Sequence, residues 1–278
     1  MSYYDQLYFM GMGVSLPEKI EIAIATLKHY EAEALKFDKD GYWLCDSYGK
    51  DSCVILHLAK RAGVKFVAHH NLTTIDPPEL IYFGRKHHAD TIVHRPVKSL
   101  FRMMVDDKHL PPSRLARWCC NEYKESSHGN SVAVFGIRSE ESASRAKRWK
   151  IWTPYRGGSW VLNPILYWSA DNVWQYIREN NIPYCSLYDE GFDRLGCIGC
   201  PMGRKKQRLQ QFARWPRYEM LWKKAFREIW ESYHGKLTVR GEARGMDKHN
   251  FNSWEDYFNW WVSDEPGKKD DECQVGLF

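Results

Sequence analysis

Apolar positions follow a helical spacing at the start of the chain and then fall into short runs separated by helical stretches. The first pattern predicts a helix over 15–36, with Ser15 as its cap and Pro17 in its first turn. Short apolar runs predict strands at 42–46, 65–70, 91–94 and 131–137, and helices at 51–62, 78–88, 98–108 and 170–180. This alternation is typical of an α/β fold with a doubly wound, mostly parallel sheet. Such sheets bind ligands at the carboxyl ends of their strands.

The character of the chain changes after Pro201. A long, basic, Trp-rich helix is expected over 204–234, followed by a Gly-rich stretch, an aromatic helix over 253–264 and an acidic tail. We therefore expect one domain over 1–203 and a helical extension over 204–278. Residues 204–248 hold 13 Lys/Arg against 5 Asp/Glu. This excess indicates either a solvated helix surface or a surface for nucleic acid.

No segment of the chain has the pattern of a membrane span or a secretory leader. No run of 18 apolar residues occurs, and the first residues lack a basic start followed by an apolar core. We expect a cytoplasmic protein without a membrane partner.

A polar turn, Ser47-Tyr48-Gly49-Lys50-Asp51-Ser52, joins the strand at 42–46 to the next helix. Such a turn exposes backbone N–H groups at the positive end of a helix, which suits a phosphate. Ser47 and Ser52 offer hydroxyls, Gly49 allows close backbone approach, and Lys50 brings a cation. A carboxylate at Asp51 is repulsive to phosphates unless it holds a metal ion or caps the helix. ATP with Mg²⁺ accounts for Lys50 and Asp51 together.

The eight cysteines are unevenly placed, which favours metal ligands or reactive thiols over disulfides in a cytoplasmic protein. Cys119 and Cys120 are adjacent, and Cys197-x-x-Cys200 lies on a Gly-containing turn. Neighbouring side chains on a helix diverge by about 100°. A [4Fe–4S] cluster therefore accommodates these four thiolates more readily than a zinc ion. Zinc and free structural thiols stay open as alternatives.

Several motifs follow one another in an order that resembles a known family. Besides the loop, they are "NLTTIDPPELIYF" (71–83), "PPSRLARWCCNEYKE" (111–125), "GIRSEESASRAKR" (136–148), "NPILYWSADNVWQYIRENNIPY" (163–184) and "LYDEGFDRLGCIGCP" (187–201). Together they resemble the phosphoadenosine phosphosulfate (PAPS) reductase family, within the ATP-pyrophosphatase group that cleaves ATP between its α- and β-phosphates. The resemblance covers about residues 40–201.

The resemblance carries implications for the fold, the site and the partners. It implies an adenine nucleotide alpha-hydrolase-like fold, an adenine nucleotide at the loop, and a cluster on Cys119, Cys120, Cys197 and Cys200. It also places Gly136 and Arg138 in the nucleotide site, with weaker indications for Arg145 and Arg148, and it suggests a homodimer. Lys50, Asp51 and Arg138 are then the expected catalytic residues. Arginine at the end of a strand suits bidentate binding of phosphate or sulfate.

Within the family, two reactions compete. Reductases carry a catalytic cysteine in Glu-Cys-Gly-Leu-His, whereas here Glu272-Cys273 is followed by "QVGLF". Lys50-Asp51 is the version of the loop that cleaves a triphosphate. We therefore favour an enzyme that activates an acceptor with ATP for sulfur transfer, served by a sulfur-donor protein and with nucleic acid as one acceptor. An adenylylsulfate or PAPS reductase that forms sulfite is the alternative.

Two other readings use other features of the chain. The last residues, Gln274 to Phe278, resemble the short peptides by which bacterial DNA-processing proteins bind the sliding clamp. This would make the chain a DNA-associated binding module. A degenerate, non-catalytic nucleotide-binding module is the other possibility, and the intact loop and cysteines argue against it.

Overall fold

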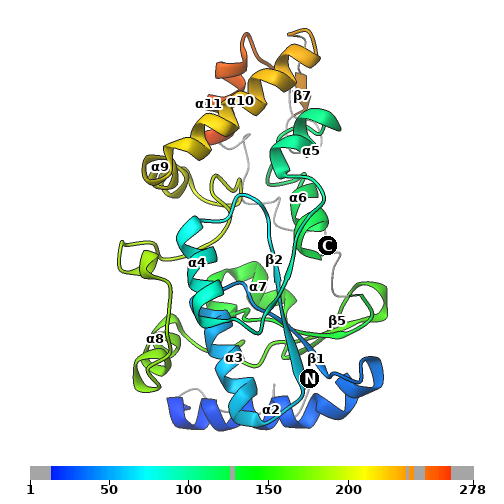
Figure 1. The fold of residues 1–278 in the computed structure, drawn as a ribbon, viewed down its shortest axis with the longest axis vertical. Helices are drawn as coiled ribbons and strands as arrows, with labels where there is room; N and C mark the ends of the chain where they lie inside the picture. Colours follow the sequence, from blue (N-terminus) through cyan, green and yellow to red (C-terminus); the bar gives the residue numbers. More distant parts are fainter. Residues whose placement is uncertain (1–13, 126–128, 236–237, 241–247, 264–278) are drawn as a thin grey trace. The chain divides into compact units, whose positions relative to one another are not determined.

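The computed structural model describes residues 14–125, 129–235, 238–240 and 248–263, and the chain divides into two compact units (Figure 1). The first unit contains Met1–Asn71, Pro78–His94 and Ser126–Leu195, and the second contains Leu72–Pro77, Arg95–Glu125 and Gly196–Phe278. Each unit is thus assembled from separate stretches of chain. The domain boundary expected after residue 203 stays a prediction.

A six-stranded sheet forms the centre of the first unit. Its strands are β1 (Tyr42–Cys45), β2 (Phe66–Asn71), β3 (Ile92–His94), β4 (Val132–Val134), β5 (Trp152–Pro154) and β6 (Trp160–Leu162). They are ordered β3-β2-β1-β4-β6-β5, and all neighbours pair in parallel except β5, which runs antiparallel to β6 at one edge. The predicted mostly parallel α/β fold is confirmed. The hairpin of β5 and β6 was not predicted.

Helices of the first unit follow the strands and bury their apolar faces. They are α2 (Leu16–Phe37), α3 (Lys50–Ala62), α4 (Pro78–His87), α7 (Ala143–Arg148) and α8 (Ala170–Glu179), with 3-10 turns at Ser139–Glu141, Arg156–Gly158 and Ser186–Tyr188. Helix α2 begins with a capping box between Ser15, the predicted cap, and Glu18. It packs on α3, and Leu27, Val54 and Leu58 are fully buried.

The second unit is mostly helical. Its elements are α5 (Leu100–Asp106), α6 (Trp118–Cys120) with a π-helical turn at Asn121–Glu125, α9 (Lys205–Arg214), α10 (Pro216–Ser232), α11 (Trp254–Val262), and a hairpin of β7 (Thr238–Arg240) with β8 (Lys248–Asn250). The single helix predicted over 204–234 is wrong. Pro216 has no N–H to continue α9, and it instead starts α10 as a first-turn residue.

Tryptophans of the C-terminal helices form the core of the second unit. Helix α10 packs against α5 and α11, as Figure 1 shows. Trp222 and Trp261 lie buried with their ring centroids 4.6 Å apart, and Phe226 is buried against Trp261. These aromatic side chains therefore stabilise the unit rather than present a stacking surface.

Candidate nucleotide loop and cysteine site

The predicted phosphate loop lies at the carboxyl end of β1. β1 ends at Cys45 and α3 begins at Lys50, with Gly49 as its N-cap. Gly49 has φ −78° and ψ 164°, so its backbone conformation alone does not demand glycine. The loop therefore presents the positive end of a 13-residue helix at the sheet edge where ligands of such folds bind.

Three predicted catalytic residues meet in one charged cluster. Asp51 accepts a hydrogen bond from Arg138 Nε at 2.7 Å on one carboxylate oxygen and from Lys50 Nζ at 3.1 Å on the other. Arg138 also donates to Glu140 at 2.7 Å. Lys50 and Arg138 are only 6% and 5% exposed, so these charges are held with little freedom. Two cations on one carboxylate, beside a helix N-terminus, can bind a polyphosphate.

The remaining loop residues differ in what they leave accessible. Ser52 is buried and donates from Oγ to the Gly49 carbonyl oxygen at 2.8 Å. Ser47 is exposed, and its Oγ lies 3.3 Å from the Ser52 Oγ. Gly136 packs against the backbone of Asp51, because a Cβ there would lie 3.1 Å from the Asp51 carbonyl carbon. Ser47 is thus the hydroxyl that faces solvent, and Gly136 permits the approach of β4 to α3.

Tyr48 fixes the loop, and sequence reasoning did not single it out. Its φ of 60° lies in the left-handed region that a bulky residue rarely adopts. The ring is 2% exposed, stacks on His70 with centroids 3.9 Å apart, and lies against Gly84 of α4. A Cβ at Gly84 would come within 2.3 Å of the ring. Such strain persists only where the surroundings determine it.

Asp46 is a second anchor that the sequence did not reveal. It is buried and accepts hydrogen bonds from the Tyr48 N–H at 3.0 Å, from His88 Nδ1 at 2.5 Å and from the Thr91 hydroxyl at 2.9 Å. Burial would raise the pKa of Asp46, but the hydrogen bond and charge of His88 and the other donors hold it below its ordinary value. The far nitrogen of His88 lies 3.7 Å from the Cys53 sulfur, and burial raises the pKa of that thiol.

Tyr188 holds the first residue of α3. The Lys50 N–H donates to the Tyr188 hydroxyl at 2.9 Å, and Lys50 Nζ lies 5.4 Å from the centre of the Tyr188 ring. Burial raises the pKa of Tyr188, so the phenol stays protonated. The Tyr188 hydroxyl thus accepts from a first-turn N–H of α3 that would otherwise be available to a ligand.

The four predicted cysteines all lie in the second unit, where Cys119 is influenced by the other three. The pKa of Cys119 is raised, first by its hydrogen bond with Cys120 and then by burial and by the charges of Cys197 and Cys200. That hydrogen bond lowers the pKa of Cys120, aided by Arg117. The charge of Cys197, foremost among the nearby acidic groups, raises the pKa of Lys124. Burial raises the pKa of Cys197 against the opposing charge of Lys124, so the thiolate form is favoured at Cys120 and not at Cys119 or Cys197.

C-terminal helices hold the Cys197–Cys200 turn. The Gly199 N–H donates to Gln211 of α9 at 2.9 Å, and Trp222 of α10 donates to the Ile198 carbonyl oxygen at 3.1 Å. Gly199 has φ +76°, and a Cβ there would lie 2.6 Å from the Trp222 ring nitrogen. Glycine is therefore required at this position.

The segment with Thr73 and Asp76 joins the cysteine site. Asp76 accepts from the Thr73 N–H and hydroxyl, each at 2.7 Å, which closes a tight turn. The Cys197 thiol donates to the Thr73 hydroxyl at 3.4 Å. Asp76 thus supports the turn that contacts Cys197.

A metal centre fits these residues by donor chemistry and not by present spacing. Four sulfur donors and two flanking cations suit a thiolate-ligated centre. Within the residues that the structure describes, however, no three Cys, His, Asp or Glu side chains are placed to hold a metal ion. The predicted cluster and the zinc alternative therefore remain predictions.

Comparison with known proteins identifies the family. Residues 41–203, more than half of the chain, match the phosphoadenosine phosphosulfate reductase domain. The chain belongs to the phosphoadenosine phosphosulfate reductase domain family. The family match supports the nucleotide-binding fold predicted from the loop and the strand–helix alternation.

Relatives of this PAPS reductase family chain match it only in part. An uncharacterised protein of Methanocaldococcus jannaschii is 29% identical over 234 residues, 75% of this chain and 47% of that protein. An adenosine 5′-phosphosulfate reductase of Oceanobacillus iheyensis is 40% identical over 72 residues, 26% of this chain and 30% of that protein. The chain thus spans half or less of these relatives.

A solved structure agrees with the fold. The phosphate complex of a PAPS reductase from Candida auris has a TM-score of 0.50 and 18% identity, covering 71% of this chain and 96% of that one. At this identity the likeness shows the fold alone. It matches the expectation from the strand–helix alternation.

Other predicted residues lie outside these two clusters. Arg145 forms an ion pair with Glu141, and Arg148 is exposed beside the Trp149 ring. Cys53 and Cys185 are buried, and Cys45 is half-buried. Cys273 and the segment 274–278 lie outside the described residues. In the described part of the chain, no helix is long and apolar enough to span a bilayer.

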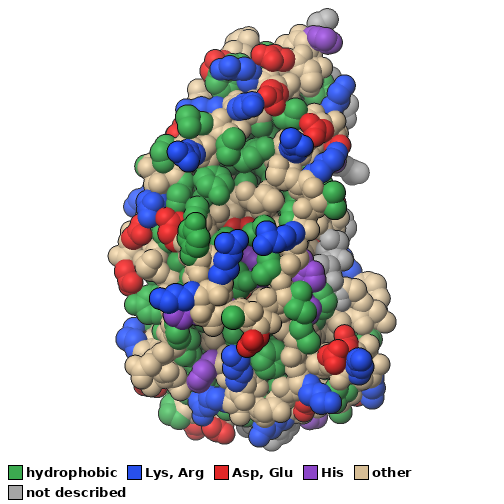
Figure 2. Space-filling model, viewed as in Figure 1, with side chains coloured by type: hydrophobic (Ala, Val, Ile, Leu, Met, Phe, Trp, Pro, Cys, Tyr) green, Lys and Arg blue, Asp and Glu red, His purple; other side chains and the backbone are tan. Residues whose placement is uncertain are grey.

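Two cations of the basic stretch after residue 204 are engaged within the second unit. Arg208 is 2% exposed and donates to the Trp261 carbonyl oxygen at 2.5 Å, at the C-terminal end of α11. A cation at that end offsets the helix dipole. Lys223 is paired with Glu219 at 2.7 Å. On the face shown in Figure 2, Lys and Arg side chains are spread among acidic and hydrophobic ones.

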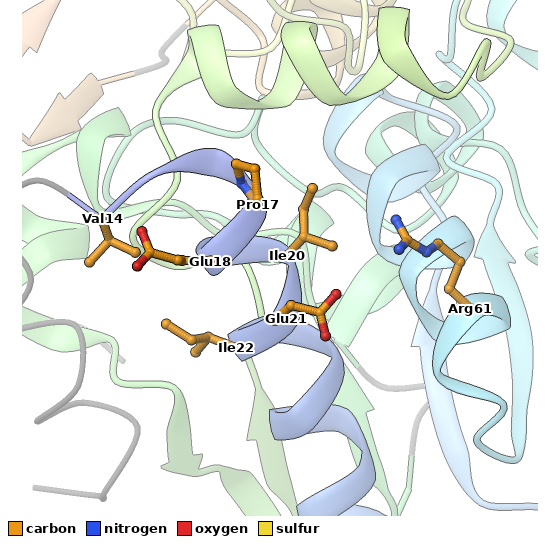
Figure 3. Close-up of a pocket in the computed structure, with 7 residues that line it drawn as sticks. All are labelled: Val14, Pro17, Glu18, Ile20, Glu21, Ile22 and Arg61. Carbon is orange, nitrogen blue, oxygen red and sulfur yellow. The ribbon is translucent and has the colours of Figure 1, made fainter.

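A pocket of about 580 Å³ lies at the start of α2 and includes none of the predicted site residues (Figure 3). Its lining consists of Val14, Pro17, Glu18, Ile20, Glu21, Ile22 and Arg61. Glu18 is already engaged with Ser15 in the capping box. The pocket is therefore separate from the nucleotide loop.

Proposed function

We propose that this chain binds ATP at the Ser47–Ser52 loop and cleaves it to AMP and pyrophosphate in order to activate an acceptor for sulfur transfer. The observation that carries this proposal is the sharing of Asp51 by Lys50 and Arg138 at the N-terminus of α3. Two cations at a helix N-terminus are suited to the phosphates of ATP. Asp51 supplies a carboxylate for Mg²⁺, the metal that accompanies ATP in such sites.

In the proposed step, an acceptor oxygen attacks the α-phosphorus of ATP. The bond from the α-phosphorus to the bridging oxygen breaks, and pyrophosphate leaves with the electron pair. Lys50, Arg138 and the exposed Ser47 hydroxyl stabilise the negative charge that develops on the phosphate oxygens. A sulfide ion from a donor protein then attacks the activated acceptor atom: the new bond joins sulfur to that atom, and AMP leaves with the acceptor oxygen and the electron pair.

For the sulfur step, we propose that Cys119, Cys120, Cys197 and Cys200 hold a [4Fe–4S] cluster. A bound cluster supplies iron at which a sulfur atom can be held. Arg117 and Lys124 favour the deprotonated thiols, and Thr73 orients Cys197 through its hydroxyl. Nucleic acid is the proposed acceptor class, and a homodimer is the proposed assembly.

A reductase is the second candidate, since relatives of this chain are adenosine 5′-phosphosulfate reductases. In that reaction the nucleotide substrate carries the sulfur, and sulfite is the product. The two candidates are distinguished by which nucleotide is consumed.

Pyrophosphate release from ATP tests the proposal. Anaerobically purified full-length chain is assayed with ATP and Mg²⁺, and separately with adenosine 5′-phosphosulfate for sulfite. Lys50→Gln should lower pyrophosphate release by about 10²- to 10³-fold, the usual loss when one charge-stabilising group is removed. Lys60→Gln, at the exposed end of the same helix, is the matched control and should retain activity. Sulfite formation without pyrophosphate release would establish the reductase instead.

Metal content tests the cysteine assignment separately. We expect about four irons per chain and a broad absorption near 400 nm, both lost in Cys197→Ala. Cys45→Ala, in the first unit, should keep the iron. One zinc and no iron would contradict the cluster and leave the nucleotide proposal standing.

A further inference from the structure

Residues 145–160 combine positive charge with aromatic rings in a way that the nucleotide site does not use. The stretch contains five Lys/Arg, four Trp/Tyr and no Asp/Glu. We call it the 145–160 surface. It comprises α7, β5, the turn at Arg156–Gly158 and the start of β6, all in the first unit.

Cations of the 145–160 surface face solvent. Lys147, Arg148, Lys150 and Arg156 are all exposed. Arg145 pairs with Glu141, and Arg138 holds Glu140, so these two neighbouring carboxylates are already engaged with other cations. The surface therefore carries a net positive field that attracts a polyanion.

Aromatic rings lie between these cations and are only half-buried. Trp149 and Tyr155 are stacked, with centroids 6.2 Å apart and planes 23° apart. Trp152 stacks on Trp160 at 5.0 Å and on Tyr30 at 4.3 Å, which makes a continuous stack of three rings. Half-exposed rings beside cations are the platform on which bases of single-stranded nucleic acid stack.

The backbone beneath the 145–160 surface is well tied down. β5 pairs with β6, and the Tyr155 N–H donates to the Ser159 carbonyl oxygen at 2.8 Å across the turn. The Asn163 side chain donates to the Lys150 carbonyl oxygen at 2.9 Å. Rings on a rigid edge hairpin lose little freedom when a base stacks on them.

The surface also reaches the ligand-binding edge of the sheet. Trp152 is opposite Leu162, the last residue of parallel strand β6, so Trp149 and Lys150 lie at the carboxyl edge. The phosphate loop follows β1 at this same edge. Three strand spacings of about 4.8 Å separate β1 from β5, roughly 14 Å in all. A few nucleotides of an extended strand span that distance.

We propose that the 145–160 surface binds single-stranded nucleic acid, with phosphates on its lysines and arginines and bases on its half-exposed rings. The further role of this strand as the acceptor that reacts with ATP rests on the proposed function. The binding of the strand does not. Duplex nucleic acid fits less well, because its bases are stacked on one another and unavailable to the rings.

Fluorescence anisotropy of labelled 20-nucleotide single strands of DNA and RNA, with the full chain and no ATP, tests the proposal. We expect the logarithm of the association constant to fall with the logarithm of salt concentration with a slope near −3, about 0.7 for each of four cations. Lys147→Gln/Lys150→Gln/Arg156→Gln should weaken binding at least tenfold at low salt. The matched control Arg204→Gln/Lys206→Gln/Arg217→Gln removes the same charge from exposed positions around α9 and α10 and should bind normally.

Stacking is tested by Trp149→Ala and Trp149→Phe. Alanine should weaken binding about tenfold, and phenylalanine should restore most of it, because the gain from stacking needs a ring and not a particular side chain. The proposal is overturned if the control triple weakens binding as much as the 145–160 triple. It is also overturned if duplex or heparin binds as tightly as single strands. Pyrophosphate release measured on the same variants separates a failure of binding from a failure of the ATP chemistry.

Discussion

The contact between Gly84 and Tyr48 allows a change of one methyl group to test how the nucleotide loop is held. In Gly84→Ala, the new Cβ would lie 2.3 to 2.5 Å from three ring atoms of Tyr48. Ordinary contact begins near 3.4 Å, so the ring would have to move by about 1 Å. His70 stacks on the ring and the Tyr48 backbone is already strained, which leaves it little room. We expect a loss of about 3 kcal/mol in the free energy of unfolding, the upper end for overpacking.

Removing the Tyr48 ring reverses the sign of the effect of Gly84→Ala on the free energy of unfolding. In a Tyr48→Gly background the clash is absent, and alanine instead of glycine inside α4 should stabilise by up to about 1 kcal/mol. Tyr48→Gly itself should cost about 2 kcal/mol, because the lost burial exceeds the relief of the left-handed backbone. The coupling between the two sites is thus roughly 4 kcal/mol, measurable as a double-mutant cycle.

Urea unfolding of the four proteins, followed by far-UV circular dichroism, measures the cycle. The four proteins can be compared if they share the same m-value, the slope of the free energy of unfolding against urea concentration. An equal cost of Gly84→Ala in both backgrounds would refute the reasoning, since the cost would then not come from the Tyr48 ring. ATP binding by the same proteins reports whether the loop depends on this packing.

Three further changes probe other contacts. Asp46→Asn should destabilise by about 2 kcal/mol at pH 7, the strength of hydrogen bonds to a charged group. Because the pKa of Asp46 is lowered by folding, this difference should shrink as the pH falls below its ordinary value of 3.8, as thermal unfolding across pH would show. Arg208→Met should loosen the end of α11 in hydrogen exchange, whereas exposed Arg217→Met should not. Tyr188→Phe should leave ATP affinity by calorimetry undiminished, since it frees the Lys50 N–H, while Tyr188→Ala should weaken it; equal losses in both would contradict this.

Local patterns predicted the strands and helices of the first unit well, because their apolar faces repeat at regular spacing. β5 was not predicted because it contains Pro154, which argues against a strand, and its partner β6 was missed with it. The helical pattern continues on both sides of Pro216, so one helix was predicted where the structure has two. Short elements and helix breaks depend on tertiary packing more than on periodicity.

Motifs predicted the site residues that carry charge but not those that position them. Lys50, Asp51 and Arg138 could be named because their chemistry is visible in sequence. Asp46 and Tyr188 act through hydrogen bonds to partners 42 and 138 residues away. Arg208 belongs to a stretch that the sequence predicts as a charged surface, but in the structure its side chain is buried. A side chain's partner at such separation is set by the fold, and one sequence holds no signal for it.

The division of the second unit among three stretches of chain sets the order in which its thiol site can form during synthesis. Cys119 and Cys120 leave the ribosome long before the turn that Gly199 and Trp222 shape, because α10 ends only at Ser232. At bacterial or eukaryotic rates of 5–20 residues per second, that interval is roughly 5 to 20 s. During this interval, Cys119 and Cys120 lack the other two cysteines and the helices that hold the Cys197–Cys200 turn. Loading of any metal centre on these four cysteines is therefore a late event in biogenesis, and a chain ended after residue 203 would never reach it.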